Sequence, residues 1–135
     1  MRKLNIAIIG LGNIANSFAE AIREISDCQL KGIASLNKSK LSIFGEKYNI
    51  DKKYRFNSYD ELINSDQIDA IYIATLNNTH KDLIIKSIDA KKNILCEKPI
   101  TINDQEIKDV YKKIKDSKIF FLEAIAYRSH PISKA

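Results

Sequence analysis

The stretch LNIAIIGLGNIA, residues 4–15, is an apolar run that ends in two closely spaced glycines. Its first six residues predict a buried strand. Gly10 permits a tight turn, Gly12 lets a phosphate approach the backbone, and the small Ala15 allows a helix to pack closely on the strand. The helix predicted at residues 15–25 would offer its first N–H groups to the phosphates. This order predicts a dinucleotide-binding turn, and a glycine turn without a ligand is the alternative.

The rest of the chain alternates short apolar strands with helical patterns, which is typical of βαβ units in a parallel sheet. We predict strands at residues 4–9, 28–35, 54–56, 69–75, 93–97 and 119–122. Between them we predict helices whose N-caps are Ser58, Asn78 or Thr79, and Asn103. The predicted fold class is α/β: a doubly wound, mostly parallel Rossmann-type sheet in a single domain.

The composition fits one globular domain in the cytoplasm. The 135 residues are 44% hydrophobic and 29% charged, with a net charge of +5. No apolar run reaches the roughly 20 residues of a membrane helix. The lysines occur singly or in pairs, which argues against nucleic-acid binding. Cys28 and Cys96 are far apart and lack metal-ligand spacing, so we expect two buried thiols and no metal site.

The end of the second predicted strand should select between NAD and NADP. An Asp or Glu about 20 residues beyond the glycines usually binds the ribose 2′-hydroxyl of NAD. Here residues 35–40 read SLNKSK and contain no carboxylate. Ser35, Asn37, Lys38 and Lys40 could accept a 2′-phosphate, or they could simply be a polar strand end followed by helix-start lysines. We therefore favour NADP over NAD.

Two more segments should lie at the same edge of the sheet, where ligands bind in open α/β folds. Residues 75–80 read TLNNTH, and His80 is either a residue of the cofactor crevice or a surface residue at a helix start. Residues 96–99 read CEKP. There Lys98 could hydrogen-bond a substrate hydroxyl and stabilise alkoxide charge, while Glu97 could orient Lys98 or the nicotinamide ribose. A surface salt pair between Glu97 and Lys98 is the alternative.

These three motifs, at residues 10–15, 75–80 and 96–99, occur in the order typical of one family. In them the chain resembles the N-terminal domain of the glucose–fructose oxidoreductase/inositol dehydrogenase family (Gfo/Idh/MocA). Residues 121–131, FLEAIAYRSHP, are similar to the domain exit of its dihydrodiol and xylose dehydrogenase branch. The resemblance implies a second, larger α/β domain that supplies another catalytic group, usually a histidine, and most substrate contacts.

The resemblance also implies domain bounds and residue roles. Residues 1–124 would be the dinucleotide-binding domain, and residues 125–135 would begin the connection to a substrate domain that the chain lacks. Lys98 would be catalytic and would contact both cofactor and substrate. The other residues implied at the cofactor are Gly10, Gly12, Asn13, Ile14, Thr75, Leu76, Asn77, His80, Glu97 and Arg128. Leu36 is a departure, because branch members that prefer NADP usually have arginine there.

The sequence thus predicts an NAD(P)-dependent oxidoreductase, or its cofactor-binding part, that transfers hydride between nicotinamide and a carbon of a sugar, polyol or diol. Its partners would be the dinucleotide and a small polyhydroxylated substrate. Apolar surface normally covered by a second domain would favour a homo-oligomer. The alternatives are a non-catalytic dinucleotide-binding module or truncated remnant, and a basic Rossmann protein that binds nucleic acid.

Overall fold

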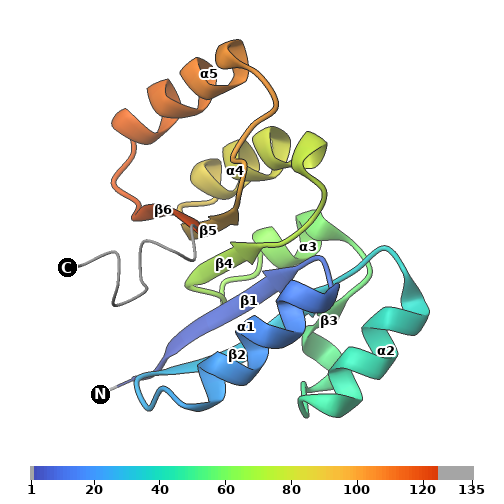
Figure 1. Ribbon diagram of the computed structural model, residues 1–135. Helices are drawn as coiled ribbons and strands as arrows, with labels where there is room; N and C mark the ends of the chain where they lie inside the picture. Colours follow the sequence, from blue (N-terminus) through green and yellow to red (C-terminus); the bar gives the residue numbers. More distant parts are fainter. Residues whose placement is uncertain (1, 125–135) are drawn as a thin grey trace, which may run out of the picture.

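One parallel sheet of six strands, in the order β3-β2-β1-β4-β5-β6, forms the centre of the molecule (Figure 1). The strands are β1 (Leu4–Ile9), β2 (Cys28–Ala34), β3 (Arg55–Phe56), β4 (Ala70–Ile73), β5 (Asn93–Glu97) and β6 (Phe121–Ala124). This computed structural model describes residues 2–124, and every strand pairing among them is parallel. Because the chain builds the sheet outward from β1 in both directions, the doubly wound α/β prediction is confirmed.

Two layers of helices cover the sheet. The helices are α1 (Asn13–Arg23), α2 (Lys38–Lys47), α3 (Tyr59–Ile63), α4 (His80–Asp89) and α5 (Asp104–Lys115), with 3₁₀ turns η1 (Lys52–Tyr54) and η2 (Asn77–Thr79). Three helices begin at a side-chain cap. The Ser58 hydroxyl accepts from the N–H of Glu61, and the Asn103 side chain accepts from the N–H of Glu106. These two predicted caps are confirmed, and Asn37 caps α2.

The predicted cap of α4 is right in position only. Thr79 is the N-cap residue of this helix, which begins at His80 directly after η2, but no side chain caps it. The Thr79 hydroxyl donates to the Leu76 carbonyl oxygen at 2.6 Å and is therefore bound within the preceding turn. Asn78 lies inside that turn. A threonine hydroxyl can bond either to the helix start or to the preceding turn, and the residue pattern does not show which of the two bonds forms.

The last strand also differs from its predicted range of 119–122. It runs from Phe121 to Ala124, and the Phe120 N–H before it donates to the Asn93 side chain at 2.9 Å. Ile119, an apolar residue counted in the predicted strand, packs against the buried core before the strand begins. The predicted bounds of β1 and β5 are confirmed, and the remaining element ends shift by at most two residues, as in the first helix, which covers Asn13–Arg23 and not residues 15–25.

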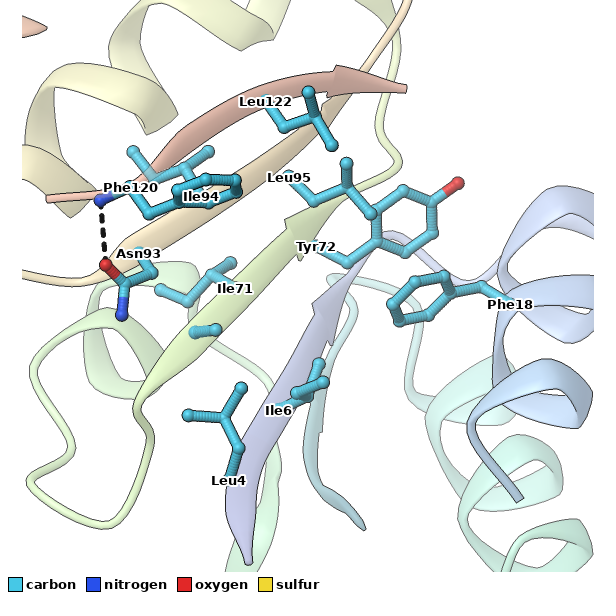
Figure 2. Close-up of a pocket in the computed structure, with 11 residues that line it drawn as sticks. Leu4, Ile6, Phe18, Ile71, Tyr72, Asn93, Ile94, Leu95, Phe120 and Leu122 are labelled. Atoms are coloured by element: carbon cyan, nitrogen blue, oxygen red, sulfur yellow. Dashed lines mark hydrogen bonds between the residues drawn. The ribbon is translucent and has the colours of Figure 1, made fainter. Parts of the chain in front are cut away.

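One face of the sheet is covered by α1 and α2 only over part of its width. Beyond α1, strands β1, β4, β5 and β6 line an apolar groove of about 330 Å³ (Figure 2). Leu122 is 50% exposed and Phe120 is 67% exposed at its β6 side. The groove is an apolar surface of the kind that the sequence analysis anticipated, and self-association through such a surface stays a prediction.

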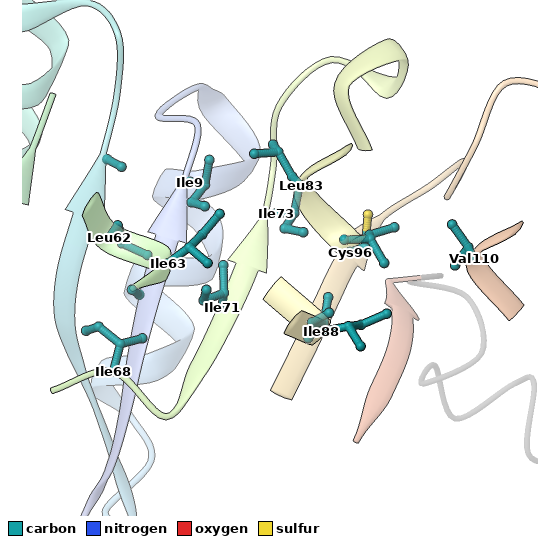
Figure 3. Close-up of a cluster of buried hydrophobic side chains, with 14 residues drawn as sticks. Ile9, Leu62, Ile63, Ile68, Ile71, Ile73, Leu83, Ile88, Cys96 and Val110 are labelled. Carbon is teal, nitrogen blue, oxygen red and sulfur yellow. The ribbon is translucent and has the colours of Figure 1, made fainter. Parts of the chain in front are cut away.

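The opposite face carries the larger core, beneath α3, α4 and α5 (Figure 3). Ile71 and Ile73 of β4 and Cys96 of β5 are buried there. Cys28 is buried too, so the prediction of two buried free thiols is confirmed. Burial, together with the nearby charges of Glu123 and Glu97, raises the pKa of the Cys96 thiol to about 12. Cys96 therefore stays protonated and is no nucleophile at neutral pH.

Candidate functional site

The first glycine of the N-terminal motif joins the ends of three strands. Gly10 has a φ of +93°, which L side chains rarely adopt. Its N–H donates to the Ala34 carbonyl oxygen, at the end of β2, at 3.0 Å. A Cβ atom on Gly10 would lie 2.8 Å from the carbonyl group of Ala74, just after β4. Only glycine fits between these strand ends.

The second glycine leaves the start of α1 open. Gly12 is the N-cap of α1, and no side chain caps this helix. A Cβ atom on Gly12 would meet no atom within 4 Å, and Asn13 and Ile14 are exposed. The first N–H groups of a helix lack intrahelical acceptors, and the helix dipole favours an anion near them. Gly10, Gly12, Asn13 and Ile14 lie at this open helix start, and their contact with a pyrophosphate stays a prediction.

Residues 35–40 follow β2 at the same edge of the sheet. Ser35 is buried, and its hydroxyl accepts from the N–H of Asn37 at 3.1 Å. The side chain of Asn37 accepts in turn from the N–H of Lys40 at 3.0 Å and begins α2. Ser35 and Asn37 therefore shape the turn, while the exposed Lys38 and Lys40 contribute positive charge to it.

The loop after β4 contains a buried histidine. Thr75 is half-buried and its hydroxyl lies 2.6 Å from that of Thr79, whereas Leu76 and Asn77 are exposed. His80 is only 1% exposed, so the alternative that it lies on the surface is wrong. Its Nε2 lies 3.0 Å from the carbonyl oxygen of Thr75.

The other ring nitrogen of His80 reaches the next loop. Its Nδ1 lies 2.8 Å from the carbonyl oxygen of Pro99. Because a carbonyl oxygen only accepts and either neutral tautomer of the imidazole has one N–H, the ring donates to one of these two carbonyl oxygens and lies close to the other. His80 thus lies between the chain leaving β4 and the chain leaving β5, and it contributes to the site by holding backbone together.

The CEKP segment leaves β5 beside these residues. Lys98 is exposed, Glu97 is half-buried, and the Lys98–Pro99 peptide bond is cis. Over residues 2–124 no salt bridge joins Glu97 to Lys98, so the alternative of a surface salt pair is wrong. Glu97 instead accepts a hydrogen bond from the Tyr72 hydroxyl at 2.5 Å.

Two residues of this arrangement were not found by sequence reasoning. Tyr72 of β4 holds the Glu97 carboxylate, and Glu123 of β6 accepts from the N–H of Ile100 at 3.0 Å. Burial first, and then the hydrogen bond and charge of Glu97, raise the pKa of the Tyr72 phenol. The phenol therefore stays protonated and donates. The sequence signal for Tyr72 was a hydroxyl group inside a short apolar strand. Because buried polar groups need hydrogen-bond partners, this hydroxyl group predicted a polar partner nearby.

The predicted site residues thus gather along one edge of the sheet, the carboxyl ends of its strands. Contacts run from Ala34 at the end of β2, through Gly10 after β1 and Thr75 after β4, to Pro99 after β5. Arg128 lies outside the described residues. Within residues 2–124, no helix is long and apolar enough to cross a membrane.

A glycine turn and an uncapped helix, placed where a doubly wound parallel sheet reverses its strand order, define a dinucleotide-binding Rossmann domain. The chain belongs to the GFO/IDH/MocA oxidoreductase family. The family model, described as an oxidoreductase family with an NAD-binding Rossmann fold, matches residues 4–123. The resemblance stated from the three motifs is therefore confirmed.

Known relatives share this domain but are longer. The chain is 32% identical to mouse trans-1,2-dihydrobenzene-1,2-diol dehydrogenase over 98% of its own length and 40% of that enzyme. It is 34% identical to myo-inositol 2-dehydrogenase of Thermotoga maritima over 85% of its length and 33% of that enzyme. The scyllo-inositol dehydrogenase of Lactobacillus casei, solved with NAD(H) and scyllo-inositol, shares the fold with a TM-score of 0.92 at 21% identity, over 98% of this chain and 39% of that one. The chain thus spans about 40% or less of these proteins.

Proposed function

We propose that residues 1–124 are the cofactor-binding domain of an NAD(P)-dependent oxidoreductase that transfers hydride between nicotinamide and a CH–OH carbon of a sugar, polyol or diol. The observation that carries the proposal is the exposed Lys98, which stands on the same strand-end edge as the glycine turn at Gly10 and Gly12. The diol and inositol dehydrogenases among the relatives support the substrate class. We further propose that residues 125–135 lead toward a substrate domain.

The residues present fit a nicotinamide dinucleotide. Gly10 and Gly12 keep the turn free of side chains, and the start of α1 would bind the pyrophosphate. Leu76 and Asn77 would line the path toward the nicotinamide, and Glu97 would accept hydrogen bonds from the nicotinamide ribose. A bound nicotinamide would supply the hydride acceptor or donor.

Lys98 is the proposed catalytic residue. Its ammonium group would donate a hydrogen bond to the reacting oxygen of the substrate and stabilise the alkoxide charge that develops there. It is exposed, with no salt bridge in the described part of the chain, so its charge is available to a substrate. A second acid–base group would come from another domain, and the site formed by residues 1–124 is incomplete without it.

We also propose that the domain prefers NADP to NAD. Lys38 and Lys40 are exposed beside the end of β2, and no carboxylate lies in residues 35–40 to repel a 2′-phosphate. Leu36, which is 66% exposed, supplies no charge and limits the expected preference. The expected location stays the cytoplasm, and a homo-oligomer stays a prediction.

Calorimetric titration of the purified chain with NADPH and NADH tests the proposal. Saturable binding of both, with NADPH tighter, is the expected result. Tighter NADH would overturn the cofactor preference alone. No binding of either dinucleotide would contradict the cofactor-binding function of this domain. Binding without turnover of any sugar, polyol or diol would agree both with a site that another domain completes and with the alternative of a non-catalytic dinucleotide-binding module.

Lys98→Ala tests the catalytic assignment. The side chain is exposed, so the variant should unfold at the temperature of the parent and keep NADPH affinity to within about tenfold, the value of one charged hydrogen bond. It should abolish any oxidation of sugars, polyols or diols that the parent supports. Lys108→Ala is the matched control, because Lys108 is also an exposed lysine but lies on α5, outside the proposed site. It should leave the unfolding temperature, the NADPH affinity and the turnover unchanged. Loss of stability in Lys98→Ala would instead make Lys98 a structural residue.

A further inference from the structure

Tyr72 places the only hydroxyl group on strand β4. The residue is 2% exposed, between Ile71 and Ile73, which face the opposite side of the sheet. Its aromatic ring packs against Phe18 of α1, with ring centroids 4.0 Å apart, at the end of the apolar groove (Figure 2). Phenylalanine would fill the same space, so apolar packing alone does not account for a hydroxyl group here.

Within residues 2–124 the hydroxyl group has one hydrogen-bond partner, the Glu97 carboxylate on the neighbouring strand. Tyr72 pairs in register with Leu95, two residues before Glu97, so the phenol extends along the sheet toward the strand ends. It donates to Oε1 of Glu97 at 2.5 Å. Oε2 of Glu97 accepts no hydrogen bond from residues 2–124, which leaves the second carboxylate oxygen for a ligand.

We propose that Tyr72 is the positioning residue of Glu97: its hydroxyl fixes one carboxylate oxygen, so that the other is directed at the hydroxyl groups of the nicotinamide ribose. A buried donor that already has its geometry removes rotamer freedom from Glu97 before the ligand arrives, and such preorganisation increases affinity. Tyr72 is too buried to touch the cofactor itself, so it acts through Glu97. The inference rests on the proposed function, because it assigns the ligand of that same site.

A second arrangement of contacts keeps the adjoining backbone in place without Tyr72. His80 contacts the Pro99 carbonyl oxygen, and Glu123 binds the N–H of Ile100. Removal of the Tyr72 hydroxyl should therefore free the Glu97 side chain and leave the loop around Lys98 where it is. The effect should be confined to the nicotinamide half of the dinucleotide.

The test is a double-variant cycle of Tyr72→Phe and Glu97→Gln in the full 135-residue chain. Each protein is titrated with the reduced dinucleotide that the parent binds more tightly, and with its adenosine half: ADP for NADH, or 2′-phospho-ADP for NADPH. These halves lack the second ribose and the nicotinamide. Tyr72→Phe should weaken dinucleotide binding about tenfold, the value of a hydrogen bond to a charged group, and leave binding of the half unchanged. The double variant should bind the dinucleotide no more weakly than Glu97→Gln alone.

The control is Phe18→Leu, which disturbs the packing on the same ring and leaves the hydrogen bond between Tyr72 and Glu97 its donor and acceptor. It should lower the unfolding temperature and leave the ratio of the two affinities unchanged.

Three results would overturn the inference. Tyr72→Phe could lose affinity for the dinucleotide and for its adenosine half equally, or it could leave the dinucleotide affinity unchanged. In the double variant, the losses of dinucleotide affinity caused by the two substitutions could multiply. If Tyr72→Phe folds poorly, Glu97→Gln still tests the inference. An unchanged dinucleotide affinity in that variant would mean that the Glu97 carboxylate does not bind the ligand, so that Tyr72 would have no binding group to position. A parent that binds neither ligand would refute the proposed function as well, and the two failures are therefore distinguishable.

Discussion

A Gly12→Val variant should fold as the parent does and bind NADH and NADPH about 100-fold more weakly. A Cβ atom at Gly12 meets nothing within 4 Å, and its backbone, at φ −93° and ψ −164°, lies in the extended region that valine favours. The same open space is where the pyrophosphate would approach the first N–H groups of α1. A branched side chain there blocks hydrogen bonds to a charged ligand, each worth about 1.5–3 kcal/mol.

Titration calorimetry and thermal unfolding, performed on the same preparations, check this expectation. Gly12→Ala is the matched variant, because it adds one methyl group and should give a smaller loss of affinity at the same unfolding temperature. If Gly12→Val bound either dinucleotide with the affinity of the parent, the pyrophosphate would not lie against Gly12, and the placement of the cofactor at α1 would be wrong.

The fold was largely predictable because its signals are local. The glycine motif at 10–15 follows a strand and opens a helix, and the Ser58 and Asn103 caps involve residues three positions away. Alternation of strands and helices then leaves few topologies for a parallel sheet. The turn before His80 was missed because the Thr79 hydroxyl can bond either to the start of α4 or to the Leu76 carbonyl oxygen. The residue pattern contains nothing that decides between these two local partners.

The contacts within the site were less predictable, because they join residues that are far apart in the sequence. His80 could be placed at the crevice or on the surface, and its burial depends on carbonyl groups of Thr75 and Pro99, the latter 19 residues away. Glu97 could pair with Lys98 or orient the ribose. The structure gives its carboxylate Tyr72 and not Lys98 as a partner, a residue 25 positions away that strand register brings near.

Gly10→Ala should destabilise the protein by about 3 kcal/mol, which for a chain of this size lowers the unfolding temperature by roughly 10 °C. Two costs add. The φ of +93° is strained for any L side chain, at about 1–3 kcal/mol. The new Cβ atom would also lie 2.8 Å from the backbone of Ala74 and 2.9 Å from the Thr75 side chain, and backbone between two strands has little room to move.

Thermal unfolding of Gly10→Ala beside Gly12→Ala separates the two glycines, because the substitution is the same and only the surroundings differ. Gly12→Ala should unfold within about 2 °C of the parent, since its Cβ atom meets open space. Gly10→Ala should lose both stability and dinucleotide affinity, because the strand ends that it joins are the ones that place the turn. A Gly10→Ala protein as stable as the parent would mean that β1 and β4 separate readily at their carboxyl ends. The edge that holds Thr75, His80 and Lys98 together would then be too loose to form the site proposed for it.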